Sequence, residues 1–337
     1  MKTTTHTTLP PSFFLGIDVG KKDLFCHIIG SDQSHSERFD NTLTGIRLLL
    51  KWITKTCIPT HLVACLEQTG HYGDSIAEAL YKLKLAAVYL VYPQRIKAFG
   101  MQKLRRNKSD TADAKLIARF LKSEHFEMRP WQPRSHVQQQ ITALSRYVDS
   151  LTQNTARLKT MLEGQTERIA ITSIKRRIKL QEKEILTLNR KIKELIKSDP
   201  GLQAKSVLLK SIPGLGDTAT HIVIAELPDL DHFDDARQLA AWAGLTPRHF
   251  VSGTSGKTRT PITKIGSCRL RRGLFMPAMT ARIYNPLLRE FAERLLKNGK
   301  KRKEVIIAIM RKLLHQIYGI LKSGQPYNPE KRGYAGT

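Results

Sequence analysis

The sequence predicts an α/β domain at the amino-terminal end of the chain, followed by a mostly helical remainder. Between Phe13 and about Lys122, short apolar runs alternate with segments whose apolar residues recur at helical spacing. From about His136 to Asp199, glycine occurs only at Gly164, and the apolar residues are mostly three, four or seven positions apart. This second stretch is typical of a helical hairpin or a coiled coil. After it, helical segments are separated by glycine-rich turns.

The elements of the first domain follow a recognisable order. Two strands, over residues 13–19 and 24–29, are joined by a turn and form a hairpin. The next elements are a helix over 44–54, a strand that ends at Glu67, a helix over 74–83 and a strand over 86–92. Pro93 then breaks the pattern, and the last helix begins after Ser109, a good N-cap residue. This is the order of a ribonuclease-H-like α/β domain.

Four acidic residues stand out in this domain. Asp18 interrupts an apolar run that ends in a glycine turn, and Glu67 lies at the end of another apolar run. Asp110 and Asp113 lie at the start of the last helix, and their spacing of three places them on one helical face. Acids in the first turn of a helix also interact favourably with its dipole, so either one alone is explained by helix stability. Four acids at matching places in one topology favour a shared role.

Such a set of carboxylates can hold two divalent cations in an oxygen-lined pocket. A two-metal pocket cleaves or transfers phosphodiesters, with one ion on the attacking oxygen and one on the leaving oxygen. The composition agrees, because 56 Lys and Arg against 29 Asp and Glu give a formal net charge of +27. A surplus of that size is typical of a protein that binds the phosphate backbone of nucleic acids.

The sequence also predicts where the chain works. The four cysteines form no Cys-x-x-Cys pair, which argues against a zinc site or a disulfide framework and favours the reducing cytoplasm. No apolar run reaches the roughly 18 residues of a membrane-spanning helix. We therefore expect a cytoplasmic protein with no membrane contact.

Two further segments favour contacts with nucleic acid. Ile212-Pro213-Gly214-Leu215-Gly216, between two helical stretches, resembles the turn of a helix-hairpin-helix motif, whose backbone amides contact DNA phosphates. Residues 246–259 form a polar, glycine-rich loop, and a basic cluster follows it at 264–272. A basic loop of this kind is equally typical of a solvated surface, so the loop alone assigns no function.

Taken together, these motifs resemble the DEDD transposases of bacterial insertion sequences of the IS110 class, which are also described as bridge-RNA-guided recombinases. Gly16-Ile17-Asp18-Val19-Gly20-Lys21, Leu66-Glu67-Gln68-Thr69-Gly70 and residues 108–114 are similar, in order and spacing, to the family's Holliday-junction-resolvase-like (RuvC-like) domain. The 212–216 turn, Ala243-Gly244-Leu245-Thr246-Pro247-Arg248, Ser252-Gly253 and residues 262–271 are similar to its carboxyl-terminal transposase domain.

The resemblance implies three parts and a mechanism. The parts are a RuvC-like DEDD domain over 12–130, a helical coiled-coil segment over 131–204 and a transposase domain over 205–325. In this family the acidic tetrad, here Asp18, Glu67, Asp110 and Asp113, binds Mg²⁺. A serine attacks the DNA, and the matching position is Ser252, with Ser255 as a close rival.

The resemblance further implies the partners of the chain. These are donor DNA and target DNA, a non-coding bridge RNA that selects both, and other copies of the chain in a dimer or tetramer. Acids and serine then meet between subunits.

Three other functions remain as alternatives. A RuvC-like junction resolvase or nuclease would use the tetrad and a metal-activated water, and phosphoserine-linked DNA would separate it from the serine mechanism. An actin-like kinase shares the Gly-Ile-Asp-x-Gly motif but needs a second glycine-rich phosphate loop, which we do not find. A non-enzymatic DNA-binding protein would leave the tetrad unexplained.

Overall fold

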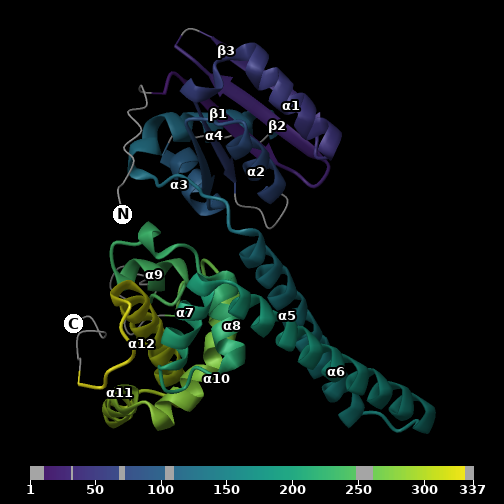
Figure 1. Cartoon of the computed structure of the whole chain (residues 1–337), viewed down its shortest axis with the longest axis vertical. Helices are drawn as coiled ribbons and strands as arrows, with labels where there is room; N and C mark the ends of the chain where they lie inside the picture. Colours follow the sequence, from purple (N-terminus) through teal and green to yellow (C-terminus); the bar gives the residue numbers. More distant parts are fainter. Residues whose placement is uncertain (1–10, 32, 68–72, 103–109, 248–260, 331–337) are drawn as a thin grey trace, which may run out of the picture. The chain divides into compact units, whose positions relative to one another are not determined.

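The computed structural model describes residues 11–31, 33–67, 73–102, 110–247 and 261–330. Contacts between residues divide the chain into two compact units, Met1–Pro133 and Arg134–Thr337 (Figure 1). The three-part division predicted from the sequence stays a prediction. None of the helices in the described ranges has the length and apolar character needed to cross a membrane.

The amino-terminal unit is built on a five-stranded mixed sheet in the order β3-β2-β1-β4-β5. The hairpin pairs β1–β2 and β2–β3 are antiparallel, whereas β1–β4 and β4–β5 are parallel. The strands are β1 (Phe13–Val19), β2 (Asp23–Ile29), β3 (Ser34–Asp40), β4 (Leu62–Glu67) and β5 (Ala87–Val91). This mixed α/β arrangement fits the predicted ribonuclease-H-like domain.

Helices cover both faces of this sheet. One face packs against α1 (Leu43–Thr56) and α2 (Asp74–Lys82) through a core that includes Leu15, Ile17, Leu49 and Ile76. The opposite face packs against α4 (Asp110–Glu124), and α3 (Pro93–Gln102) lies beside α4. Because successive strand residues face opposite sides, β1 supplies Leu15 and Ile17 to one core and Phe14 to the other.

The structure confirms five elements predicted for this unit, namely β1, β2, α1, β4 and α2. Two elements were missed. β3 is polar and exposed along most of its length, so it carries no apolar alternation. The second is α3, which begins at Pro93 itself, because a proline in the first turn of a helix lacks only an N–H that has no intrahelical partner. Ser109, the predicted N-cap of α4, lies outside the described residues.

The carboxyl-terminal unit is helical in its described part. Its helices are α5 (His136–Glu163), α6 (Arg168–Ser198), α7 (Pro200–Lys210), α8 (Asp217–Glu226), α9 (Ala236–Trp242), α10 (Cys268–Tyr284), α11 (Pro286–Lys297) and α12 (Arg302–Ser323). The helices α5 and α6 run side by side as the predicted hairpin and extend away from the other helices (Figure 1). Helix α12 packs against α7, α9, α10 and α11, with a buried stripe that includes Ile309, Leu313 and Ile317.

The packing of α4 on the sheet depends on Gly16. A Cβ atom at this position would lie 2.3 Å from the Ala114 carbonyl oxygen and 2.3 Å from the Ala118 amide nitrogen. We expect Gly16→Ala to lower the free energy of unfolding by about 1–3 kcal/mol, the usual cost of overpacking. Urea unfolding measures the change. Gly164→Ala is the control, because a Cβ atom added there would have no other atom within 4 Å, and a loss of stability beyond about 0.5 kcal/mol there would contradict this account.

Candidate active site

Two of the predicted acidic residues lie side by side at the end of the sheet. Asp18 is the penultimate residue of β1 and Glu67 is the last residue of β4. The two strands are parallel, and their register pairs Ile17 with Leu66, one position before both acids. Asp18 and Glu67 are therefore level with each other on neighbouring strands. Both are partly buried.

The same two acids lie on the face of the sheet that α4 covers. Gly16 contacts α4 directly, and Asp18, two positions along the strand, shares its face. Cys65 pairs with Gly16 in the register and belongs to the core on the α4 side, so Glu67 shares that face too. Alternation and register together place both carboxylates on the same face of the sheet, the one that α4 covers.

Helix α4 brings a third predicted acid to this region. Asp113 precedes Ala114, whose carbonyl oxygen is at the closest approach to Gly16. Asp113 is also four residues before the fully buried Ile117, so it belongs to the stripe of α4 that faces the sheet. Asp110 is the first residue of α4, and its side chain lies outside the described residues.

The carboxylates suit a divalent metal by their chemistry, because Mg²⁺ prefers carboxylate oxygens as ligands. Within the described ranges, however, no group of three or more His, Cys, Asp or Glu side chains is close enough to hold a metal ion. Segments 68–72, directly after Glu67, and 103–109, directly before Asp110, lie outside those ranges. The complete tetrad as a ligand set therefore stays a prediction.

Sequence reasoning missed a histidine on the same face. His27 pairs with Gly16 across β1 and β2 and is buried, with its Nδ1 2.7 Å from Ser36 Oγ. Its Nε2 is buried without a hydrogen-bond partner. Burial lowers the pKa of His27, and Lys115 and Arg119 of α4 lower it further, so the ring is neutral at pH 7. The signal in the sequence that could have found it is a polar residue, His27, within the otherwise apolar run of β2.

Ser252 and Ser255 lie outside the described residues, within 248–260, but the described residues on either side of that segment pair with each other. Pro247 and Ile262 form an antiparallel bridge, and Thr263 N donates to Thr246 O at 2.9 Å. We call these paired ends, residues 244–247 and 262–266, the neck. The two described ends of the chain on either side of 248–260 therefore lie side by side.

A tight backbone contact and an arginine hold the neck. Gly266 has a φ of +114°, and a Cβ atom there would lie 1.8 Å from the Trp242 carbonyl oxygen. Only glycine fits this contact. Arg271 of α10 donates from Nη1 to the Ala243 carbonyl oxygen at 2.8 Å. These contacts tie the neck to the end of α9 and to the start of α10.

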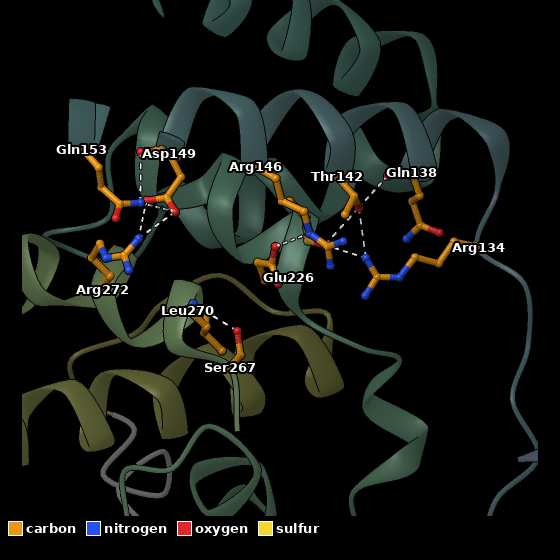
Figure 2. A network of polar contacts seen from close by, with 11 residues as sticks. Arg134, Gln138, Thr142, Arg146, Asp149, Gln153, Glu226, Ser267, Leu270 and Arg272 are labelled. Carbon is orange, nitrogen blue, oxygen red and sulfur yellow. Dashed lines mark hydrogen bonds and ion pairs between the residues drawn. The ribbon is translucent and has the colours of Figure 1, made fainter. Parts of the chain in front are cut away.

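A line of polar contacts anchors α8 and α10 on α5 (Figure 2). Arg272 Nη1 lies 2.8 and 2.7 Å from the two carboxylate oxygens of Asp149. Arg146 pairs with the nearly buried Glu226 at 3.0 Å. Near the start of α5, Arg134 donates to the hydroxyl oxygen of Thr142 at 3.0 Å. The Arg272–Asp149 pair thus links α10, which begins two residues after the neck, to α5.

The predicted hairpin turn joins α7 to α8. Gly214 has a φ of +106°, and a Cβ atom there would meet the backbone and Cβ of Ala281 on α10 at 2.7–2.8 Å. Asp217, the first residue of α8, pairs with Lys210 and, at 3.3 Å, with Lys193. The hydrogen bond from Lys210 lowers the pKa of Asp217. Helices flank the turn on both sides, as predicted, whereas its likeness to a helix-hairpin-helix motif and its contact with DNA phosphates stay predictions.

The mixed sheet, with acidic residues at the ends of β1 and β4, fits a ribonuclease-H-like domain. Residues 15–170 match the DEDD transposase family model of IS110 elements, and residues 206–293 match the Transposase IS116/IS110/IS902 family model. The pilin gene-inverting proteins of Moraxella bovis and Moraxella lacunata are 31% and 30% identical to the chain. Each alignment covers 94% of this chain and 97% of the relative.

A third relative, the transposase for insertion sequence element IS1111A of Coxiella burnetii, is 27% identical over 54% of this chain and 56% of its own length. The chain belongs to the IS110 family of DEDD transposases. It is a transposase/recombinase enzyme whose family binds DNA as substrate and uses divalent metal.

Proposed function

We propose that this chain cleaves and rejoins DNA by Mg²⁺-dependent chemistry in which Asp18, Glu67, Asp110 and Asp113 hold two Mg²⁺ ions. One observation carries the proposal: Asp18 and Glu67 are level at the ends of the parallel strands β1 and β4, on the face that α4 covers. When bound, the ions would neutralise charge that develops on the scissile phosphate. The carboxylates fix where that phosphate lies.

Ser252 is the proposed nucleophile. Its Oγ attacks the phosphorus atom, a Ser–O–P bond forms, and the bond to the 3′ oxygen breaks. The proton lost from Oγ passes to a base, and the 3′ oxygen leaves as a hydroxyl after protonation. The phosphoserine link conserves the energy of the phosphodiester for rejoining. A serine hydroxyl is a weak nucleophile at its free pKa and needs a base or a metal to activate it.

A structured bridge RNA and further copies of the chain complete the proposal. The formal net charge of +27 supports binding of more phosphates than a short DNA site presents. The family resemblance implies that the RNA selects donor and target DNA, and that acids and serine meet between subunits of a dimer or tetramer.

The test is recombination in solution on a plasmid that carries the DNA ends next to the gene and a target. Protein purified with its co-purifying RNA should form recombinant junctions in Mg²⁺, and junction sequencing should detect them. RNase treatment should remove sequence-specific recombination because the protein alone reads mainly phosphates. Specific recombination by RNA-free protein would count against the guide, although not against the recombinase.

DNA inversion is a second candidate outcome of the same chemistry. It is favoured by the two relatives named for pilin gene inversion, which align with 94% of this chain. Two sites placed in inverted orientation on one plasmid distinguish the outcomes. Inversion preserves plasmid length and reverses the segment, whereas transposition gives a new insertion. Cleavage by a metal-activated water, the resolvase alternative, would instead leave DNA ends with no attached protein.

A further inference from the structure

Four cations from three helices gather on the carboxyl-terminal unit. They are Arg237 of α9, Arg294 of α11, and Arg311 and Lys312 of α12, and we call them the cationic cluster. The Arg294 guanidinium carbon lies 5.5 Å from the centre of the Phe291 ring, and the Lys312 Nζ lies 5.7 Å from the same centre. Two positive charges therefore share one aromatic ring.

Packing of the three helices forces these charges together. Leu239 of α9, Ala292 of α11 and Leu313 of α12 belong to one hydrophobic core. Burial lowers the pKa of the Lys312 ammonium, and Arg311, Arg294 and Arg237 each lower it further by repulsion. Like charges held this close destabilise the free protein unless an anion offsets them.

A buried histidine, His315, lies near the same positive charges. His315, on the next turn of α12, is 4% exposed, and both of its ring nitrogens lack a hydrogen-bond partner. Burial lowers the pKa of His315 to about 4, and Arg311, Lys312 and Arg237 act in the same direction while Asp235 opposes them. His315 is therefore neutral at pH 7 and adds no charge of its own.

Asp235, the N-cap of α9, is the carboxylate that opposes the positive charge at His315, and it also accepts a hydrogen bond from Gln238 N at 2.7 Å. In the part of the chain that the structure describes, Arg294 and Arg311 form no ion pair. An arginine over an aromatic ring uses the face of its guanidinium and keeps its N–H edge for a phosphate.

We propose that the cationic cluster binds the phosphate backbone of a nucleic acid, using residues that neither the acidic site nor the Ser252 segment contributes. The side chains of Arg237 and Arg294, which are exposed, would contact one backbone phosphate. Those of Arg311 and Lys312, which are half-buried, would contact a neighbouring phosphate. The proposal rests on the recombinase function only in requiring nucleic acid as partner. DNA and RNA share this backbone chemistry, and the experiment separates them.

The test is the salt dependence of binding, measured in chelator so that no cleavage occurs. For a duplex DNA, the slope of log Kobs against log salt concentration changes by about 0.9 for each phosphate contact, and for a single strand by about 0.7. Arg294→Gln should lower the magnitude of the slope by about one contact, and the double variant R294Q/R311Q by about two. The slope does not depend on the fraction of active protein, so partial unfolding would not mask the result.

Arg289→Gln is the matched control, since it removes the same charge from an exposed position on the same helix, outside the cluster. A lower slope for the cluster variants with duplex DNA alone assigns the surface to DNA, and with single-stranded RNA alone it assigns the surface to RNA. A lower slope with both gives a general backbone site. Cluster variants whose slopes equal that of R289Q with both nucleic acids overturn the proposal, whether or not the protein recombines DNA.

Discussion

Asp18→Asn is expected to abolish strand cleavage while leaving DNA binding in place. The substitution keeps the shape of the side chain and removes the charge that would hold a divalent cation at the end of β1. Loss of metal stabilisation is worth several kcal/mol at the transition state, so the cleavage rate should fall by about a thousandfold or more. Single-turnover cleavage of labelled DNA measures the rate, and calorimetric titration with Mg²⁺ measures the loss of metal binding.

Asp23→Asn is the control for this variant. Asp23 is also an acid of the same sheet, but its carboxylate pairs with Arg38 at 2.6 Å on the surface. Losing such an exposed pair costs about 0–1 kcal/mol of stability and should leave cleavage unchanged. Cleavage by D18N at the rate of the unaltered protein, or an equal loss of cleavage in D23N, would show that Asp18 is not a metal ligand.

The acidic strand ends were predictable because two strong local signals coincide there. An apolar run that ends in a carboxylate and a glycine turn places the carboxylate at a sheet edge, as β1 and β4 show for Asp18 and Glu67. Which strands are neighbours cannot be read from the runs themselves. The parallel pairing of β1 with β4 depends on long-range packing, and the structure supplied it.

Other features could not be predicted from the sequence, because no local pattern of residues marks them. β3 is a polar, mostly exposed strand that pairs with β2 along its whole length, so no hydrophobic period marks it. Arg237, Arg294 and Arg311 look like ordinary charges on three separate amphipathic helices. They become one cluster only because the core packs α9 and α11 against α12.

Ser252→Ala is expected to eliminate the covalent protein–DNA product. The methyl group cannot attack phosphorus, so no phosphoserine bond forms, whereas RNA, DNA and Mg²⁺ binding should stay as they are. The contacts of the neck explain why the loss of the covalent product should not be accompanied by a loss of binding. Its bridge between Pro247 and Ile262 and the Arg271–Ala243 contact involve no atom of Ser252, so the substitution leaves the ends of the segment in place. Denaturing gel electrophoresis of end-labelled DNA detects the adduct.

Ser255→Ala separates the proposed nucleophile from its nearest rival. Ser255 lies in the same segment, three residues further on, and carries the same hydroxyl. If Ser252 is the nucleophile, S255A should retain at least part of the adduct yield, whereas S252A retains none. Peptide mapping by mass spectrometry then locates the phosphodiester on one residue. A link at Ser255 would reassign the nucleophile, and cleaved DNA without any adduct would favour attack by a metal-activated water at the acidic site.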